Sequence, residues 1–570
     1  MKTINILNNC FLILGLVIIS VSLYIWIKNY KKNTQINTIT GITEKITRNE
    51  WIVFSAVLLA ALLIRLWQYG AVPGGMNQDG AMAAVDAKAL AEHGTDRYGM
   101  HMPVHFTAWG YGQMSVFLSY CMVPFIKIFG LSAITARLPI LIASMCALAA
   151  LYFIIRRLFG IRGAQIVLIL ASCNPWHFMQ SRWALDCNMF PHMFVIGLMF
   201  LLMGLEKKRR YVYISMVFFA FCMYSYGIAF YTVPVFLLVV CIYILVKKVL
   251  KWSEVLISAG VYFLVSWPIY LTMMINTFKW NTIETPFFTI PFFPDSVRSQ
   301  DILFFADDKL GQLQKNIRAL VRIFTEGDHL LWNNIDGFGV INICFVPLIF
   351  LGIYYVIHML RKEKDVLKKT GFLSILCFFG IGIFAGIITS EVNVNRINII
   401  IYPFIILAGI GIYFVYINHK KLSYVFAPIY IILSVMFIGK YFTDYADEIK
   451  SQFFKGFIEA VQYIEDESDC AFYVITPDSQ FEGAYNVSEI LTLFAQDIDS
   501  EYYQNKYKDD NGLLYKEKYY YVNASQTEIN PQLPVAYVVT EAEVSLFSQD
   551  VYTIVPFDNF YAVIPSELAY

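Results

Sequence analysis

Long apolar runs recur along the chain, and polar or charged segments separate them. Each run is about 18 to 22 residues long, which is enough for a helix to cross the hydrocarbon core of a bilayer. The pattern predicts about twelve transmembrane helices. They lie near residues 10–27, 51–69, 138–155, 163–180, 190–205, 211–227, 228–246, 254–274, 337–360, 371–389, 397–418 and 424–442.

Basic residues between these runs indicate which loops face the cytoplasm. The loops of one side hold 22 of the 37 Lys and Arg residues that precede Thr443. Since cytoplasmic loops carry an excess of Lys and Arg, these clusters are expected inside and both chain ends outside. The clusters are Lys28/Lys31/Lys32/Lys45/Arg48, Arg156/Arg157/Arg162, Lys207/Lys208/Arg209/Arg210, Lys247/Lys248/Lys251, Arg361/Lys362/Lys364/Lys368/Lys369 and Lys420/Lys421.

The apolar segment 113–130 does not fit as a full crossing. It contains Pro124 and Lys127, and counting it as a span would invert every later loop. We expect an interfacial or re-entrant helix inside a long outer loop, 70–136, where protein covers the backbone. A full crossing with a compensating half-span elsewhere is the alternative.

The composition agrees with a polytopic membrane protein and excludes an ordinary soluble globule. Hydrophobic residues make up 58% of the 570 residues and charged residues 15%. The expected partners therefore include the lipid bilayer and no nucleic acid. The ten cysteines lack CxxC or Cys/His spacing, so they predict neither a disulfide framework nor a Cys-based metal site.

The tail from Thr443 onward differs from the rest of the chain. It holds 23 acidic and only 6 basic residues, and short β-branched and aromatic runs follow a helical pattern at 453–464. These runs, at 471–476, 519–522 and 536–540, predict strands of a small extracytoplasmic α/β domain. The expected division is an N-terminal anchor with a cytoplasmic loop (1–50), a transmembrane catalytic domain (51–442) and the soluble tail domain (443–570).

Four polar clusters fall on the outer side of this topology. They centre on Asp79, Arg137, the segment 181–186 and the segment 391–396. An acid at the mouth of a transmembrane bundle is a functional hypothesis, although a helix N-cap or a solvated loop aspartate is the alternative for Asp79. Convergence of acids and arginines on one membrane face is typical of a catalytic cavity.

These residue types suit the transfer of a sugar from a lipid phosphate to a hydroxyl group. Asp79 is the candidate base for the acceptor hydroxyl. Arg396 and Arg182 are the candidates that bind the donor phosphate, because a guanidinium group meets two phosphate oxygens at once. Each arginine also has an alternative interpretation. Arg396 would only extend to the membrane interface, and Arg182 would form a local ion pair with Asp186.

Weaker candidates surround these three. Asp186, His101, His105 and Glu391 are candidate ligands for the acceptor or for a divalent cation, a candidate cofactor that the sequence does not specify further. An amphipathic pattern at 310–324 predicts a helix on the outer leaflet, either near the entry of a lipid donor or as a lid.

Several motifs, in order, resemble those of the GT-C membrane glycosyltransferases. Similarity is strongest to the bacterial aminoarabinose (lipid A) transferases and the protein O-mannosyltransferases. The motifs are Asp79 in the first outer loop, Arg137-Leu138-Pro139, Asn174-Pro175 followed by 181–186, and Asn395-Arg396 leading into Tyr402-Pro403. The chain departs from the pattern by Asp79-Gly80, where relatives often have Asp-Glu, and by its extra N-terminal span and its tail.

The resemblance implies an α-helical polytopic fold and an inverting transferase of the cell membrane. Its donor would be a polyprenyl-phosphate-linked sugar, its acceptor a lipid, glycan or protein hydroxyl, and Asp79 the essential acid. A transporter or flippase of lipid-linked glycans is the main alternative, although the conspicuous charges cluster at the outer ends of the spans rather than at mid-span.

Overall fold

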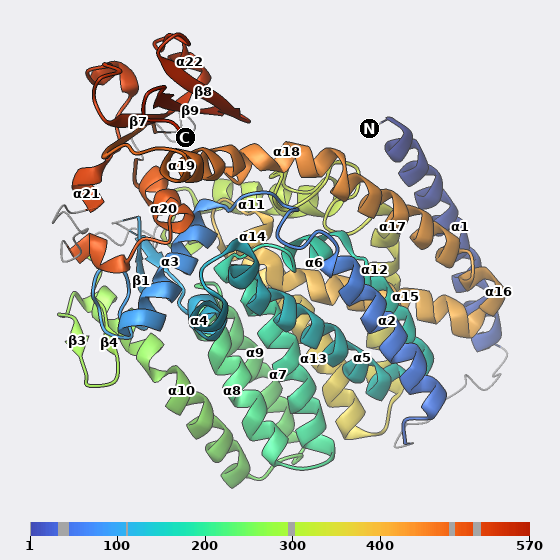
Figure 1. The fold of residues 1–570 in the computed structure, drawn as a ribbon. Helices are drawn as coiled ribbons and strands as arrows, with labels where there is room; N and C mark the ends of the chain where they lie inside the picture. Colours follow the sequence, from blue (N-terminus) through green and yellow to red (C-terminus); the bar gives the residue numbers. More distant parts are fainter. Residues whose placement is uncertain (1, 32–44, 110–111, 295–301, 478–484, 505–514) are drawn as a thin grey trace.

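The computed structural model describes residues 2–31, 45–109, 112–294, 302–477, 485–504 and 515–570. A bundle of long helices carries a small sheet domain at one end (Figure 1). Within these residues, ten helices are long and apolar enough to cross a membrane. They include α1 (Lys2–Lys31), α2 (Arg48–Leu66), α5 (Ala133–Ser172), α7 (Met189–Glu206), α9 (Ala229–Val246), α10 (Trp252–Phe278), α12 (Val346–Lys362), α13 (Val366–Ile388), α15 (Ile401–Asn418) and α17 (Phe426–Phe442).

The 40-residue helix α5 crosses the bundle twice. Gly160 interrupts it with φ 77° and ψ −177°, a conformation open to glycine. Arg156 binds Glu50 at the start of α2, whereas the Ser172 carbonyl accepts from Arg65 near the end of α2. The chain therefore turns back at Gly160. Counting α5 twice and adding the shorter apolar helix α8 (Arg210–Ser225) gives twelve crossings, as the sequence predicts.

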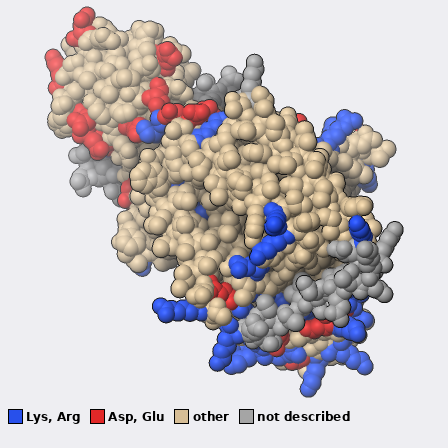
Figure 2. All heavy atoms as spheres, turned by 90° about the vertical axis from the view of Figure 1, so that its right-hand side faces the viewer, with Lys and Arg blue, Asp and Glu red and all other residues tan. Residues whose placement is uncertain are grey.

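The two ends of the bundle differ in charge. Arg156, Arg157 and Arg209 pair with acids at one end, which we call the basic end. Figure 2 shows Lys and Arg gathered there, while scattered acidic side chains lie on the sheet domain at the opposite end. Asp79 lies at that opposite end, which we call the pocket end. The predicted segregation of basic loops from the acidic tail is thus present in three dimensions.

Helix α15 lies at the centre of the bundle. Its residues 401–415 are all buried, which agrees with an apolar surface all round the helix. Helix α4 (Phe117–Phe129) has only 13 residues, so at about 1.5 Å per residue it is too short to span a bilayer. It packs on α3 (Gln78–His93) and α5. A short helix inside the outer loop is what the sequence predicts for this segment.

Short elements at the pocket end link the long helices. They are the hairpin β1 (Phe106–Ala108) and β2 (Gly112–Met114), the hairpin β3 (Ile283–Glu284) and β4 (Thr289–Ile290), α6 (Pro175–Gln180), η1 (Asp186–Asn188), η3 (Leu303–Phe305), η4 (Ile343–Phe345), α14 (Val394–Ile397) and η5 (Asn398–Ile400). The amphipathic helix α11 (Lys309–Thr325) packs on α13, where Asn316 donates to the Ile387 carbonyl at 2.7 Å. At the basic end, α16 (Lys420–Ser423) precedes α17.

The tail forms the expected small α/β domain. Helices α18 (Asp444–Gln452), α19 (Lys455–Asp466) and α20 (Tyr485–Ala495) accompany a five-stranded sheet of order β6-β5-β7-β9-β8. Strand β5 (Phe472–Ile475) is parallel to β6 (Tyr519–Tyr520) and to β7 (Val535–Thr540), while β9 (Phe560–Pro565) is antiparallel to β7 and to β8 (Tyr552–Phe557). The three predicted strands are correct, and the sequence pattern missed the hairpin of β8 and β9. Short elements complete the domain: η7 (Ser500–Gln504), α21 (Tyr515–Lys518), η8 (Ala524–Gln526) and α22 (Glu541–Val544).

Candidate functional site

The loop between α2 and α3 holds Asp79 in place. Arg137 is fully buried and donates to the carbonyls of Pro73 at 3.0 Å and Gly75 at 2.6 Å. The Met76 amide donates to the Phe453 carbonyl at 2.7 Å, which fastens the loop to the tail. Arg137 thus has the structural role that its position before Leu138-Pro139 suggests, and α3 starts from a fixed point.

Asp79 lies in the first turn of α3, where the helix N-terminus favours a carboxylate. Its Oδ1 accepts a hydrogen bond from Trp109 Nε1 at 3.1 Å. Trp109 follows β1 and has φ 54°, a left-handed conformation that costs about 1–3 kcal/mol for a bulky residue. The hairpin therefore holds the Trp109 indole on the Asp79 carboxylate, although the backbone conformation of Trp109 is unfavourable.

A cavity of about 120 Å³ lies beside Asp79. Three polar side chains from distant parts of the chain line it together: Asp79 on α3, Asp186 on η1 and Asn395 on α14. The other lining residues are Met82, Ala108, Met114, Leu185, Cys187 and Tyr226. Asn395 Oδ1 is buried and has no hydrogen-bond partner.

Asp186 is held by the short helix η1. Its Oδ1 accepts from the Cys187 amide at 2.7 Å, and the Cys187 carbonyl accepts from Asn398 Nδ2 at 2.8 Å. This second bond joins η1 to η5, which follows α14. Asp186 and Asn395 therefore reach one cavity because neighbouring buried segments are bonded together. The structure brings Asp79 and Asp186 together as the sequence predicts.

Arg396 lies next to this cavity but does not line it. Its side chain is 25% exposed, Nη1 donates to the Ser390 carbonyl at 2.8 Å, and Nη2 pairs with Glu391 at 3.3 Å. Glu391 is 80% exposed, so this ion pair is solvent-screened and weak. Arg396 is thus a partly exposed cation next in sequence to Asn395, which lines the cavity.

Arg182 has a structural role, and we withdraw its expected role on the donor phosphate. The side chain is fully buried; its Nη2 donates to the carbonyls of Trp67, Gln68 and Val72, and Nη1 donates to that of Arg65. Nε donates to Tyr441 Oη at 3.2 Å. Backbone oxygens thus engage the guanidinium group and fasten the chain after α2.

Arg65, which the sequence analysis did not single out, acts in the same way. It is fully buried, and it donates to Ser181 Oγ at 2.9 Å and contacts His177 Nδ1 at 3.0 Å. His177 and His192 each bond the Tyr402 hydroxyl, at 2.9 and 2.8 Å. His192 on α7 therefore bonds the neighbouring helix α15. Arg65, Arg137 and Arg182, all at the pocket end, thus hold loops together.

The two loop histidines lie outside the cavity lining. His105 is buried, and its Nδ1 lies 2.9 Å from the carbonyl oxygen of the preceding residue, Val104. His101 is exposed and pairs with Thr95 in an isolated bridge. Neither placement supports a role on the acceptor or on a cation at Asp79, and Glu391 contacts Arg396 instead.

A buried ion pair supports the far half of α3. Arg97 bonds Asp86 through Nη1 and donates to the Thr107 carbonyl through Nη2 at 2.8 Å, which joins α3 to the hairpin that carries Trp109. Asp96 lies beside this pair and accepts from the amides of Tyr98 and Met100. Burial, reinforced by the nearby Asp86 carboxylate, raises the pKa of Asp96 to about 7.

The tail covers the outer face of α3. Lys88 pairs with Asp497 at 2.8 Å, and His93 contacts Asp499 at 3.0 Å. Glu92, His93 and Asp499 also lie close enough together to hold a metal ion, but in the described residues they form part of this charged contact between α3 and the tail. Sequence reasoning missed the contact because its two halves are some 400 residues apart and carry no motif.

Comparison with known proteins identifies relatives by sequence and by fold. The family model of dolichyl-phosphate-mannose-protein mannosyltransferases matches residues 114–270. No curated protein sequence matches the chain. Among solved structures, ArnT from Cupriavidus metallidurans is similar in its apo state, with TM-score 0.52, 11% identity, and coverage of 92% of this chain and 99% of ArnT. The undecaprenyl phosphate-bound ArnT gives TM-score 0.54, 12% identity, and coverage of 92% and 100%.

The Archaeoglobus fulgidus oligosaccharyltransferase tethered with an acceptor peptide matches less well. Its TM-score is 0.48 at 12% identity, with 79% of this chain and 63% of that chain covered. The ArnT matches show that the chain has the GT-C fold, as its motifs predict. The chain is thus similar to membrane glycosyltransferases in fold and, over 114–270, in sequence.

Proposed function

We propose that this protein, a polytopic membrane protein with the GT-C fold, transfers a sugar from a polyprenyl-phosphate donor to a hydroxyl acceptor. The observation that carries the proposal is the cavity that Asp79 and Asp186 line together, next to Arg396. The match to ArnT with bound undecaprenyl phosphate supports the donor class, and the mannosyltransferase family model supports the reaction class.

Asp79 acts as the base. Its carboxylate takes the proton of the acceptor hydroxyl while the hydroxyl oxygen forms a bond to the anomeric carbon of the sugar. The bond between that carbon and the phosphate oxygen breaks, and the phosphate leaves with the electron pair. A single displacement inverts the anomeric centre. The bond from Trp109 fixes one carboxylate oxygen, so that the orientation of the other is set.

Arg396 stabilises the departing phosphate. Arg396 directly follows Asn395, which lines the cavity, and its guanidinium group forms an ion pair with the exposed Glu391 and a bond to the Ser390 carbonyl. A charge placed where negative charge develops lowers the barrier more than it stabilises the bound donor. Arg182, by contrast, is engaged by backbone oxygens and takes no part in this step.

Asp186 and Asn395 orient the acceptor hydroxyls. Both side chains line the cavity with Asp79. The two carboxylates also fit a divalent cation, since hard cations prefer carboxylate oxygens. When bound, such an ion would neutralise charge on the phosphate.

The reaction is proposed for the outer face of the cell membrane. The basic end of the bundle then faces the cytoplasm by the positive-inside rule, and the pocket end and the tail domain face outward. We also retain the division into an N-terminal anchor (1–50), a catalytic membrane domain (51–442) and an extracytoplasmic tail domain (443–570). A lipid, a glycan or a protein can supply the acceptor hydroxyl.

The test uses purified protein in liposomes with a radiolabelled polyprenyl-phosphate sugar and cell-envelope acceptors. Asp79→Asn keeps the shape of the side chain and removes the base, so transfer is expected to fall at least 100-fold while donor binding persists. Asp447→Asn, an exposed acid on α18 at the same end, serves as the matched control. Equal transfer by both variants, or movement of the donor across the bilayer without transfer, would contradict the proposal.

A further inference from the structure

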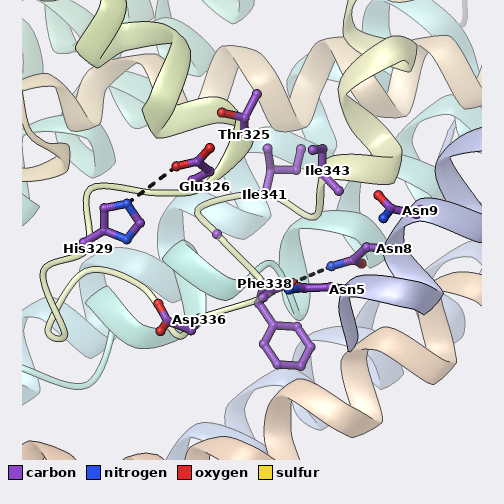
Figure 3. Close-up of a pocket in the computed structure, with 12 residues that line it drawn as sticks. Asn5, Asn8, Asn9, Thr325, Glu326, His329, Asp336, Phe338, Ile341 and Ile343 are labelled. Atoms are coloured by element: carbon purple, nitrogen blue, oxygen red, sulfur yellow. Dashed lines mark hydrogen bonds and ion pairs between the residues drawn. The ribbon is translucent and has the colours of Figure 1, made fainter. Parts of the chain in front are cut away.

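A second and larger cavity lies at the pocket end, between α1 and the segment that joins α11 to α12. Its volume is about 460 Å³, within the range of about 300–1,000 Å³ that is usual for small-molecule sites. Figure 3 shows side chains of α1, Asn5, Asn8 and Asn9, on one side and Glu326, His329 and Asp336 on the other. None of these residues lines the Asp79 cavity.

Three asparagines in the first turns of α1 are unusual, because the rest of the helix is apolar. The described part of the helix has mean hydropathy 2.6 over its membrane window, yet Asn5, Asn8 and Asn9 all line the cavity. Asn5 and Asn9 are exposed, and Asn8 is buried between them. Their common direction indicates that the helix presents a polar face to something in this cavity.

Asn8 is the strongest single observation. The residue is only 6% exposed, and its Nδ2 donates to the Gly337 carbonyl at 2.6 Å. Its Oδ1 is buried without any hydrogen-bond partner. The Nδ2 bond holds the Asn8 side chain against the Gly337 loop, so Asn8 fixes the wall of the cavity that α1 forms.

The loop on the other side is shaped to meet α1. Gly337 has φ 90°, and a Cβ atom on it would lie 2.7 Å from Ile4 Cγ2 on α1. Only glycine combines this backbone conformation with so close an approach. The cavity is therefore a built contact between two specific segments.

The lining selects the chemistry of the ligand. Among the described lining residues there is no Lys or Arg, whereas two carboxylates are present, so an anionic ligand is disfavoured. Glu326 contacts His329 at 3.6 Å, which leaves Asp336 and the three amides as the principal polar groups. Amides and single carboxylates that face one cavity match a neutral ligand with many hydroxyl groups.

We propose that this cavity binds a sugar unit, with the amides of Asn5 and Asn9 and the carboxylate of Asp336 bonding to its hydroxyls. The sugar belongs either to a free glycan or to the headgroup of a lipid, since α1 places the cavity where headgroups of the outer leaflet lie. The inference does not rest on the proposed transfer reaction, because none of its residues lines the Asp79 cavity.

A hydrogen-bonded chain connects the two cavities through the bundle. Asp328, next to His329, accepts from the Val394 amide at 2.9 Å and from Asn333 Nδ2 at 2.7 Å. Asn333 in turn accepts from Gln180 at 3.3 Å, and Gln180 accepts from Asn188 at 2.5 Å. Val394 and Asn188 each lie next to a residue that lines the Asp79 cavity. A sugar in the second cavity thus contacts a segment that also supports the first.

The test measures binding to the full chain in phosphatidylglycerol nanodiscs by saturation-transfer NMR and calorimetry. Maltose is the free probe, nanodiscs that contain diglucosyl diacylglycerol provide the lipid-linked sugar, and ethanolamine is the cationic probe. We expect maltose to bind, and Asn8→Leu to weaken this binding at least tenfold. Asp79→Asn and Asp447→Asn are expected to leave maltose binding unchanged.

Thermal melting shows whether Asn8→Leu folds. Asp336→Asn, at an exposed residue, is a second variant. Its affinity for maltose is expected to fall about threefold, the equivalent of one weak hydrogen bond. Competition of the glycolipid with maltose would assign the cavity to a lipid headgroup, and binding of maltose alone would assign it to a free glycan; both support the proposal. It is overturned if neither sugar binds, if both variants bind maltose like the wild type, or if ethanolamine binds in place of maltose.

Discussion

Gly80 packs directly against the carbonyl oxygen of Ala184. A Cβ atom on Gly80 would lie 2.6 Å from this oxygen, closer than real Cβ atoms approach backbone. With its amide oriented to satisfy both neighbours, Asn77 donates to the same oxygen at 3.2 Å and accepts from the Gly80 amide at 3.3 Å. The first turn of α3 is thereby fixed to the segment that leads to Asp186. This approach leaves no room for a side chain at position 80.

The variant Gly80→Ala is expected to lower kcat about 10- to 100-fold. The added methyl group meets a backbone atom that cannot rotate away, so α3 must shift and carry Asp79 with it, and displacements of about 1 Å have effects of this size. Initial rates of sugar transfer measure the loss. Gly439→Ala is the control, because a Cβ atom there meets nothing within 4 Å. Equal rates for the two variants would show that the contact does not position Asp79.

Replacement of Trp109 by phenylalanine tests the bond to Asp79. The ring is kept, but the Nε1 donor that lies 3.1 Å from Asp79 Oδ1 is lost. Because this donor stabilises the ionised carboxylate, the acid limb of the pH–rate profile is expected to move to higher pH, and kcat to fall a few-fold. Trp280→Phe, at an exposed tryptophan, provides the matched control. A lower rate with an unshifted profile would indicate a purely steric role for Trp109.

Arg182→Gln is expected to destabilise the protein. The substitution leaves the carbonyls of residues 65, 67, 68 and 72 without their buried donor, at about 1–3 kcal/mol for each group that stays unsatisfied. Thermal unfolding in detergent should therefore begin several degrees lower, with reduced yield of folded protein. Normal stability combined with lost donor binding would instead restore the phosphate role that the sequence suggested.

Arg396→Gln is expected to have the opposite effect. The partner in its ion pair, Glu391, is 80% exposed, so loss of this pair should change the unfolding temperature little. The loss of a charge that stabilises the departing phosphate is expected to lower kcat about 100-fold. Arg318→Gln on α11 is the matched control for removal of an outer arginine. A transfer rate within twofold of the wild type would exclude Arg396 from the reaction.

The stability of the segment after α3 is expected to depend on pH through Asp96. The pKa of this acid is raised to about 7 from the ordinary value of 3.8, mainly by burial. The stabilisation that the protonated form contributes is complete below about pH 4 and is lost as the pH rises towards 7 and above. Hydrogen exchange of residues 94–108 should accordingly quicken from pH 5 to 8 after correction for intrinsic rates. In Asp96→Asn this dependence should disappear; an equally steep dependence in the variant would assign it to another group.

Hydropathy and basic clusters were sufficient to predict the arrangement of membrane helices. A bilayer requires long apolar helices, and the basic residues in the loops indicate the direction in which each helix crosses. Even the turn inside α5 follows from Arg156 and Arg157 between two apolar runs. The strands β8 and β9 were missed, since their alternation is interrupted by Pro556 and by a two-residue turn at Asp558. Their pairing depends on β7, a partner that a local pattern does not reveal.

The cavity was predicted in part. Asp79 and Asp186 were identified because acids beside membrane spans are rare. The sequence could not distinguish the roles of Arg182 and Arg396. Both lie beside polar segments that adjoin apolar spans, and the difference between them is their burial in the folded protein. Asn395 and the covering of α3 by the tail depend on contacts between distant segments, and such contacts leave no periodic signal.

The bond between the Met76 amide and the Phe453 carbonyl has a consequence for protein engineering. A Cβ atom on Gly75 would lie 2.1 Å from the same carbonyl, so the loop and the start of α19 form one interlocked joint. Chimeras that exchange the tail between homologues must therefore exchange residues 70–99 together with it. Otherwise the new tail would pack against a loop and an α3 surface that do not fit it.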